Sequence, residues 1–299
     1  MRAVQFSEFG GPEVLQVVEL PEPHPEPSQI RVVVNACGVN PVDWKIREGM
    51  MGGELPRRIG SEVAGVVDEV GDDVTDVTAG DRVFGPTSGG AADFAILSHW
   101  AHVPATLDDA GAAALPVAVE TAVRGLDLLG VAAGETLLIN GGAGAVGTVA
   151  TQLAVDRGAR VIATASERNA ERLRAYGAEV TPYGDGLAER VQALAPDGVD
   201  RVFDMGPGGA LPELVAIAAG DPERVLTISD FAGAAETGVR ASGGADSVRR
   251  WDALDHAATL VEQGRLSLPV ERTFPLEDVA EAQRVSQAGH VSGKLVLIV

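Results

Sequence analysis

A glycine-rich turn between an apolar run and a helix-compatible run constrains this chain more than any other feature. The segment 136–147 reads Thr-Leu-Leu-Ile-Asn-Gly-Gly-Ala-Gly-Ala-Val-Gly, and the apolar run Val149–Val155 follows it. The spacing of its last three glycines matches the G-x-G-x-x-G fingerprint of strand–turn–helix units that bind dinucleotides. One glycine allows the turn, one lets the backbone approach a pyrophosphate, and one lets the helix pack close to the strand. We predict that the phosphates contact the turn and helix N-terminus at Gly142, Ala143, Gly144, Ala145, Val146 and Gly147.

The alternative is a glycine-rich turn without a ligand, because the chain contains 37 glycines. The order of strand, turn and helix weighs against that alternative, since the fingerprint has meaning only in this context.

Length and composition indicate a soluble protein of about two domains. The chain has 299 residues, of which 45% are hydrophobic and 22% charged. Its apolar runs are much shorter than the ~20 residues of a membrane helix, and the N-terminus lacks the apolar core of a signal peptide. Cys37 is the only cysteine, which excludes an internal disulfide and any zinc site with two or more thiolates. We therefore expect a cytoplasmic protein without a membrane partner.

The charge balance excludes one class of partner. The formal net charge is −20, and Lys45 and Lys294 are the only lysines. A surface of this sign repels nucleic acid. Any anionic cofactor must also be bound by local donors against the overall field, so we expect a small-molecule substrate.

Strand and helix patterns divide the chain into two kinds of fold. Val14–Leu20 and Ile30–Val34 are strand-like, and the proline-rich segment 21–27 between them excludes a helix there. From about Thr121 strand and helix signals alternate, which predicts a doubly wound parallel sheet. Candidate helices include Ala170–Tyr176 and Leu211–Ala219, and the candidate strands are Thr136–Asn140, Arg160–Ala165, Glu179–Pro182, Arg201–Met205, Arg224–Ser229 and Gly238–Ala241.

Six segments carry further motifs in a fixed order. They are Ala36–Gly49, Pro56–Val67, Gly80–Gly85, Gly89–Ala95, Ala112–Ala122 and Gly293–Val299. Together they resemble the zinc-independent, quinone oxidoreductase-like branch of the medium-chain dehydrogenase/reductase superfamily. The resemblance implies an α/β protein with a GroES-like β-rich catalytic domain (1–120 plus 267–299) and a Rossmann NADP-binding domain (121–266). It also implies a homodimer, with Gly238–Ala241 as the edge strand that continues the sheet across a two-fold axis; a monomer is the alternative.

The chain departs from zinc-dependent relatives at the metal position. Those relatives have cysteine where this chain has Asn40, and histidine where it has Ser61. Serine and asparagine are poor zinc ligands beside thiolate and imidazole. The stretch Gly85–Gly90 is also too short for the lobe that holds a four-cysteine structural zinc. We therefore expect no metal, and an acceptor that is already electrophilic, such as a quinone or an α,β-unsaturated carbonyl.

The end of the second parallel strand favours NADPH over NADH. An NAD-preferring site has an acidic residue there to bind the ribose 2′-hydroxyl, and this chain has Ala165. Ser166 can donate a hydrogen bond to a 2′-phosphate, and Arg168 can add a charge-assisted contact. Glu167 would bind the ribose if the register were shifted by two residues. Otherwise it is a first-turn acid that complements the helix dipole, with Ser166 as N-cap.

Six further residues are predicted to line the cofactor. Tyr183 resembles a position near the adenosine ribose phosphate, although packing at a strand end would explain it equally well. Asp204 ends the fourth strand on the crevice side, where it either contacts the ligand or caps the chain. The resemblance places Ile228, Ser229 and Phe231 beside the nicotinamide. It also implies that Lys294, the second of the two lysines, binds the cofactor.

Hydride transfer without a metal needs hydrogen-bond donors that stabilise the developing negative charge on the acceptor. We predict Asn40, Lys45 and Thr121 as catalytic residues. Substrate contacts are predicted for Asp43, Trp44 and Arg47. Each of three residues also has an alternative role: Lys45 as a surface cation, Trp44 in core packing and Asp43 as an N-cap. Both tyrosines lie in the cofactor half, so a tyrosine acid in the catalytic domain is excluded and solvent is a candidate proton source.

Two other functions fit the same motifs. One is a biosynthetic enoyl or alkenal double-bond reductase, which needs the same constellation as a quinone reductase. The other is a non-catalytic NADPH-binding sensor or structural protein, since an intact cofactor fingerprint serves both binding and catalysis.

Overall fold

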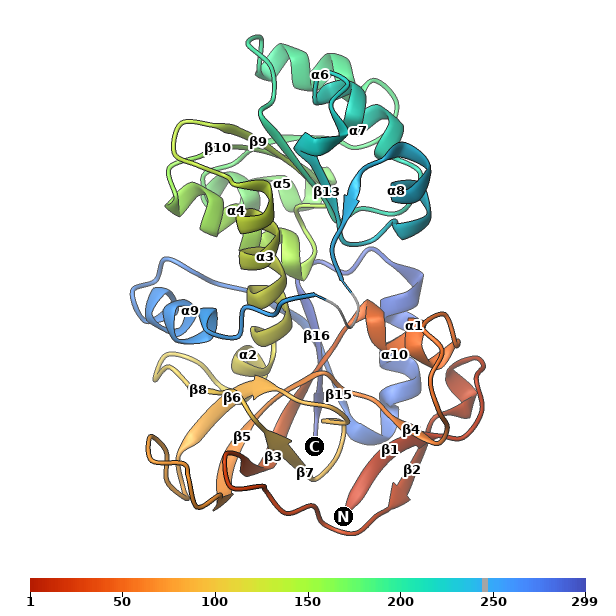
Figure 1. The fold of residues 1–299 in the computed structure, drawn as a ribbon, viewed down its shortest axis with the longest axis vertical. Helices are drawn as coiled ribbons and strands as arrows, with labels where there is room; N and C mark the ends of the chain where they lie inside the picture. Colours follow the sequence, from red (N-terminus) through yellow and green to blue (C-terminus); the bar gives the residue numbers. More distant parts are fainter. Residues whose placement is uncertain (244–246) are drawn as a thin grey trace. The chain divides into compact units, whose positions relative to one another are not determined.

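The computed structural model describes residues 1–243 and 247–299, and it divides the chain into two compact units (Figure 1). We call Met1–Val117 with Trp251–Val299 the discontinuous unit, and Ala118–Arg250 the inserted unit. The first division lies close to the expected boundary at residue 120. The second differs from the expected boundary at residue 266, because Ala253–Glu262 belongs to the discontinuous unit, where this helix packs against a strand of that unit.

The larger sheet of the discontinuous unit is organised around β3 (Ile30–Val39). Its strand order is β15-β16-β3-β5-β6-β8, and β7 also pairs with β3. A second sheet has the order β2-β1-β4. The strands are β1 (Arg2–Phe6), β2 (Gln16–Glu19), β4 (Arg57–Arg58), β5 (Glu62–Val70), β6 (Arg82–Pro86), β7 (Phe94–Leu97), β8 (Ala101–His102), β15 (Val270–Pro275) and β16 (Lys294–Ile298). The helices are α1 (Pro41–Arg47), α2 (Asp109–Ala113), α9 (Ala253–Glu262) and α10 (Val279–Ala288), with 3₁₀ turns η1 (Pro12–Val14) and η3 (Leu276–Asp278).

Strand register in this sheet brings distant residues together. Leu295 of β16 lies opposite Val39 of β3, and Val63 of β5 lies opposite Cys37. The residue that follows β3 and the residues that begin β5 and β16 therefore meet at one end of the sheet. Gly38 leaves room there, because a Cβ at this position would overlap the carboxylate of Glu62 and lie 2.7 Å from its Cδ.

The inserted unit contains the predicted doubly wound sheet. All of its strands are parallel, in the order β11-β10-β9-β12-β13-β14. The strands are β9 (Thr136–Asn140), β10 (Arg160–Thr164), β11 (Glu179–Thr181), β12 (Arg201–Asp204), β13 (Val225–Thr227) and β14 (Arg240–Ala241). The helices are α3 (Pro116–Leu129), which begins two residues before the unit, α4 (Ala145–Asp156), α5 (Glu167–Ala175), α6 (Leu187–Leu194), α7 (Leu211–Ile217) and α8 (Phe231–Thr237), with the 3₁₀ turn η2 (Pro222–Arg224). The apolar runs of β9 and β12 are buried on both faces, as parallel strands require.

Several predicted elements have different ends, each for a local reason. The strand expected from Val14 begins at Gln16, because Pro12–Val14 form a 3₁₀ turn. The last parallel strand begins at Arg240, because Gly238 is the left-handed C-cap of α8 with φ of 75°. The strand expected over Arg224–Ser229 ends at Thr227. The hydroxyl of Thr227 accepts hydrogen bonds from the backbone N–H groups of Ser229 and Asp230, which therefore do not pair with a neighbouring strand.

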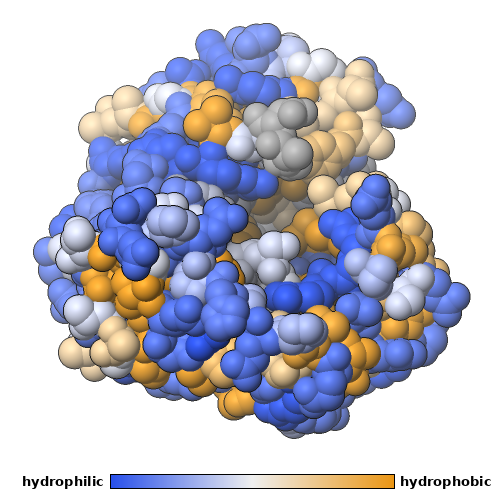
Figure 2. All heavy atoms as spheres, turned by 60° about the horizontal axis from the view of Figure 1, so that its bottom comes forward, coloured by the Kyte–Doolittle hydropathy of each residue, from blue (hydrophilic) through white to orange (hydrophobic). Residues whose placement is uncertain are grey.

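The surface agrees with the composition. Hydrophilic residues predominate on the face drawn in Figure 2. Among the residues that the structure describes, no helix has both the length and the apolar character needed to cross a membrane.

Candidate active site

The turn after β9 needs glycine at a position that the fingerprint does not include. Gly141 has φ of 88°, a left-handed conformation that favours glycine, whereas Gly144 is the N-cap of α4 with φ of −70°. A Cβ on Gly147 would lie 2.7 Å from the Cα of Gly142, so this glycine permits close packing of helix on turn. A Cβ on Gly144 would meet its nearest atom only at 3.8 Å. The space beside Gly144 is therefore open to a ligand, as the fingerprint predicts.

A chain of buried side-chain hydrogen bonds joins the carboxyl ends of four adjacent strands. The Thr164 hydroxyl donates to Asn140 Oδ1 at 2.8 Å, and Asn140 Nδ2 donates to Asp204 Oδ1 at 2.8 Å. The Thr227 hydroxyl donates to Asp204 Oδ2 at 2.7 Å. At its other end Thr164 Oγ1 accepts the backbone N–H of Gly141 at 2.9 Å. The glycine turn is thus fixed to β10, β9, β12 and β13, on both sides of the point where strand order reverses.

Asp204 is the centre of this network. Burial raises the pKa of its carboxyl group, while the hydroxyl of Thr227, the amide of Asn140 and the N–H of Gly206 lower it. Ser229 adds a fourth donor at 3.3 Å. Ligand contact and capping are the two alternatives for Asp204. Every polar contact that the structure gives this carboxylate is explained by capping, which fixes the ends of the strands.

The β10–α5 junction carries the predicted phosphate ligands. Ala165 is buried, and Ser166 is the N-cap of α5, but its hydroxyl accepts from Asn169 Nδ2 at 3.2 Å instead of capping the backbone. Glu167 lies in the first helical turn with its side chain 89% exposed, 4.0 Å from Arg174. Arg168 is exposed on the same helix.

One basic residue near the glycine turn was not predicted. Arg172, on α5, donates from Nη2 to the carbonyl oxygen of Ala143 at 3.1 Å. Because Arg172 follows Arg168 by four residues, both lie on one face of α5. That spacing is the sequence signal that could have identified it.

The remaining predicted cofactor residues of the inserted unit lie beyond the strand ends, in loops or at the start of α8. Tyr183 follows β11 with 58% of its surface exposed. Ile228 and Ser229 follow β13 and are half-buried, and Phe231 begins α8 as an exposed side chain.

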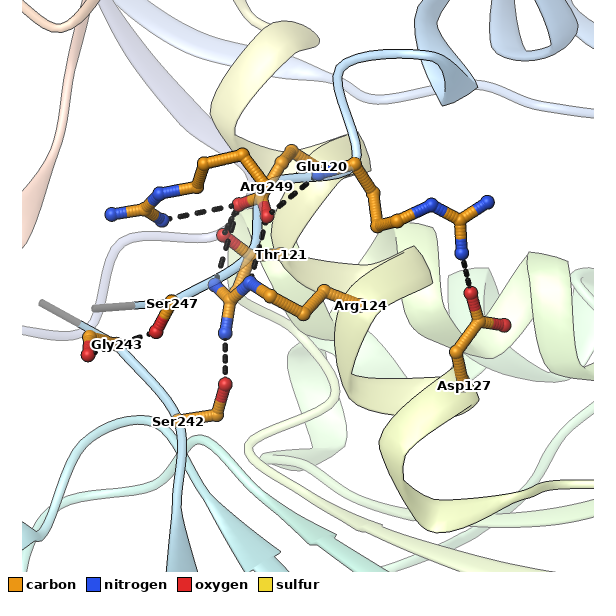
Figure 3. A network of polar contacts seen from close by, with 9 residues as sticks. Glu120, Thr121, Arg124, Asp127, Ser242, Gly243, Ser247 and Arg249 are labelled. Atoms are coloured by element: carbon orange, nitrogen blue, oxygen red, sulfur yellow. Dashed lines mark hydrogen bonds and ion pairs between the residues drawn. The ribbon is translucent and has the colours of Figure 1, made fainter. Parts of the chain in front are cut away.

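Thr121 belongs to a second polar cluster of the inserted unit, on α3 (Figure 3). Its hydroxyl donates to Glu120 Oε2 at 3.3 Å. The fully buried Glu120 carboxylate also accepts from Arg124 Nε at 2.7 Å and pairs with Arg249 at 3.4 Å. Arg124 in turn donates to Ser242, so the cluster connects α3 to the residues after β14. Thr121 is oriented by this cluster, with its hydroxyl proton directed to Glu120.

In the discontinuous unit a buried lysine occupies the centre of the predicted catalytic region. Lys294 Nζ donates to Asn40 Oδ1 at 2.6 Å and pairs with Glu62 Oε1 at 2.5 Å. Asn40 Nδ2 donates to the same Glu62 oxygen at 2.6 Å, and Glu62 Oε2 accepts the N–H of Val117 at 2.7 Å. Lys294 is 2% exposed and Glu62 fully buried. The oxygen of the Asn40 amide is therefore held by Lys294 and its nitrogen by Glu62.

Asp43 and Ser61 lie beside this cluster. Asp43 Oδ2 accepts the backbone N–H of Asn40 at 2.7 Å, which completes the capping box of α1. Its other oxygen accepts the Ser61 hydroxyl at 3.3 Å. Asp43 thus caps α1, as one alternative proposed, and also orients a hydroxyl donor.

The other predicted substrate residues on α1 differ in placement. Trp44 and Lys45 are half-buried, with Lys45 Nζ 5.7 Å from the centre of the Trp44 ring. Arg47 is fully buried, donating to Gln287 of α10 at 3.0 Å, and burial lowers the pKa of its guanidinium. The predicted role of Arg47 as a substrate ligand is corrected, because its guanidinium packs against α10.

Comparison with known proteins identifies the family. Residues 26–121 match the model of the alcohol dehydrogenase GroES-like domain, and residues 176–297 match that of the zinc-binding dehydrogenases. The human quinone oxidoreductase is 31% identical over 100% of this chain and 98% of its own length. The chain belongs to the quinone oxidoreductase branch of the medium-chain dehydrogenase/reductase superfamily.

Two further members of the branch are similar over the whole chain. An NADPH-dependent alkenal/one oxidoreductase from Arabidopsis thaliana is 32% identical over 99% of this chain and 79% of its own length. The structure of the quinone oxidoreductase from Coxiella burnetii superposes with a TM-score of 0.87 at 31% identity, covering 100% of this chain and 99% of that one. These likenesses confirm the predicted fold class, and with it an oxidoreductase.

Zinc-dependent relatives hold a zinc ion at the position of Asn40 and Ser61. The side chains of this chain at that position do not fit a zinc ion. A zinc site needs thiolate, imidazole or carboxylate ligands. Here Asn40 and Ser61 supply an amide and a hydroxyl, and the Glu62 carboxylate is neutralised by Lys294. Burial raises the pKa of the neighbouring Cys37 thiol, which keeps it protonated. In the described parts of the chain, no three His, Cys, Asp or Glu side chains are grouped to hold a metal.

Proposed function

We propose that this protein is an NADPH-dependent, zinc-free reductase that transfers hydride to a quinone or another activated α,β-unsaturated carbonyl. The observation that carries the proposal is the Lys294–Glu62–Asn40 cluster, an internally neutralised ion pair at the position of the metal. The similarity to a quinone oxidoreductase and to an NADPH-dependent alkenal/one oxidoreductase supports it.

The glycine turn and α5 are suited to a 2′-phosphorylated dinucleotide. The open backbone at Gly144 and the N-terminus of α4 would bind the pyrophosphate. Residue 165, where an NAD-preferring site has a carboxylate, is alanine. The side chain of Glu167, in the first turn of α5, extends into solvent. Arg168 and Arg172 would supply the positive charge for the 2′-phosphate, which the overall charge of −20 does not provide. Ser229 and its neighbours would lie beside the nicotinamide.

The absence of zinc ligands limits the acceptor to one that is electrophilic by itself. NADPH, when bound, would supply the hydride, and hydride transfer requires the donor and acceptor atoms to approach to about 3–3.5 Å. Trp44 would form an apolar wall for the acceptor, and Lys45 would place a positive charge near the developing anion. An unactivated ketone would need a Lewis acid to polarise its oxygen, and the Asn40, Ser61 and Glu62 side chains do not form a site for one.

Wild-type protein should oxidise NADPH when mixed with 1,4-benzoquinone, naphthoquinones, alkenals or enones in a stopped-flow experiment, and should not reduce unactivated ketones. Added zinc or a chelator should leave the rate unchanged. Enoyl thioesters in the same screen detect the biosynthetic reductase instead. NADPH binding without turnover of any acceptor would contradict the proposal and indicate the sensor.

Arg168→Ala should weaken NADPH binding at least about tenfold and leave NADH binding unchanged, because one charge-assisted contact to the 2′-phosphate is worth about 1.5–3 kcal/mol. Arg172→Ala should weaken NADPH binding more than NADH binding, because Arg172 also holds the carbonyl of Ala143 in the glycine turn. Fluorescence titration of both nucleotides measures this. The matched control is Arg174→Ala, which removes the partner of Glu167 on the same helix. If both variants kept the full preference for NADPH, the phosphate assignment would be wrong.

We also propose a cytoplasmic homodimer. The observation behind the dimer is β14, a short strand of exposed residues that pairs only with β13 among the described strands. Extension of the sheet across a two-fold axis would cover this edge.

A further inference from the structure

A hydroxyl and a buried carboxyl group beside the Lys294 cluster have no role in the proposed hydride transfer. Ser61 Oγ lies 3.3 Å from Asp43 Oδ1, and Asp43 is 3% exposed whereas Ser61 is half-buried. The second oxygen of Asp43 is bonded to the backbone of Asn40. Of these two partners, Ser61 is the more exposed, so it connects the carboxyl group to the surface.

The surroundings of Asp43 allow it to hold a proton near neutral pH. Burial and, to a smaller extent, Glu62 raise the pKa of Asp43, while the N–H of Asn40, the ammonium of Lys294 and the hydroxyl of Ser61 lower it; the balance of these effects raises the pKa to about 6. Glu62, which contacts Lys294 at 2.5 Å, opposes the effect of Lys294 on Asp43. Cys37 also faces this carboxyl group and carries a protonated thiol.

We propose that Ser61 and Asp43 form a proton relay, in which the Ser61 hydroxyl protonates the reduced acceptor and Asp43 restores the proton of Ser61. This inference rests on the proposed function. It names a proton donor within the protein in place of solvent.

The step balances for an enone. Hydride brings two electrons to the β-carbon, and the π electrons of the C=C bond move towards the carbonyl oxygen to form an enolate. The Ser61 O–H bond breaks as a C–H bond forms at the α-carbon of the enolate, and the Asp43 O–H bond breaks as the Ser61 O–H bond forms again. One solvent proton then returns Asp43 to its acid form for each NADPH oxidised.

The alternative donors in the discontinuous unit fit less well. Asn40 is held by Lys294 and Glu62 on both sides of its amide. Lys294 is buried and neutralised, and Lys45 extends over the ring of Trp44. Ser61 alone combines partial exposure with a buried acid behind it.

The test compares Ser61→Ala and Asp43→Asn with an enone and a quinone at saturating NADPH. Both variants should lower kcat on the enone about 10- to 100-fold, at the low end of general acid catalysis because water can enter. The double variant should lose no more than either single one. Quinone reduction should fall less than enone reduction in both variants, since water protonates the oxygen of the hydroquinone anion directly. Ser28→Ala, in an exposed turn, is the matched control.

Two readouts separate the relay from a structural role. Wild-type kcat on the enone should fall as pH rises through about 6, because the protonated form of Asp43 is active, and the profile should be flat in Asp43→Asn. The solvent deuterium isotope effect should change in size in Ser61→Ala, because water replaces the hydroxyl group as the proton donor. An unchanged enone rate and isotope effect in Ser61→Ala would overturn the relay, and loss of both in Lys45→Ala alone would make Lys45 the donor.

Failure of the proposed function is distinguishable from failure of the relay. If the wild type reduces neither quinone nor enone, the proposed function is wrong. Carbon-13 NMR of labelled aspartate still tests the pair: Asp43 should titrate at about 6 in the wild type and at a higher pH in Ser61→Ala. Titration near the ordinary value of an aspartate, about 4, would overturn the relay without any turnover measurement.

Discussion

Lys294→Met should destabilise the protein by about 3–5 kcal/mol, because it leaves the Glu62 carboxylate buried without its counter-ion. The measurement is the urea midpoint at constant m-value. Glu62→Gln should cost a similar amount, since it leaves the Lys294 ammonium unpaired. The double variant should cost much less than the sum, because no uncompensated charge remains in the sheet.

The control for this prediction is an exposed ion pair of the same unit. Arg284 and Glu281 of α10 lie 3.3 Å apart with about half of each side chain in solvent, so Arg284→Met should cost at most about 1 kcal/mol. Equal effects of Lys294→Met and Arg284→Met would show that the buried pair contributes no more than a surface pair.

Gly147→Ala and Gly144→Ala should separate packing from phosphate binding. A methyl group at residue 147 would lie 2.7 Å from the Cα of Gly142, and backbone on that side cannot rotate away. Gly147→Ala should therefore destabilise the inserted unit by about 1–3 kcal/mol, as overpacking does, and abolish NADPH binding because α4 is displaced from the turn.

Gly144→Ala should leave stability nearly unchanged, because the nearest atom to its methyl group lies 3.8 Å away. It should still weaken NADPH binding at least about tenfold, or 1.4 kcal/mol, since the methyl group enters the space reserved for the pyrophosphate. Calorimetric titration with NADPH and thermal unfolding of both variants measure these effects. NADPH binding by Gly144→Ala at wild-type affinity would show that the phosphates lie elsewhere.

The parallel sheet could be predicted from sequence because its signals are local. β9 has the predicted bounds, and β10, β11 and β12 differ by one residue at the carboxyl end. Each is a short apolar run followed by a turn residue, and strands buried on both faces need no other information. The exact turn glycine was missed, because the fingerprint records spacing and not backbone conformation; φ is positive at Gly141.

The polar clusters of the discontinuous unit could not be predicted in the same way. Lys294 meets Asn40 across 254 positions because β16 pairs with β3. Arg47 is buried because α10, more than 200 residues later, lies over α1. A charged residue carries no local sign of such a partner, and charged side chains are ordinarily exposed. The family resemblance located the region, and the strand register determined which side chains meet.

The discontinuous course of the first unit affects the order of folding during synthesis. The inserted unit is continuous in sequence and is complete once Arg250 has left the ribosome. β3 must wait for β16, the strand that separates it from β15, until residues Lys294–Ile298 have been synthesised. At about 5–20 residues per second this delay lasts roughly ten seconds or more. During that interval the early strands expose an unpaired edge that chaperones or the nascent chain itself must protect from aggregation.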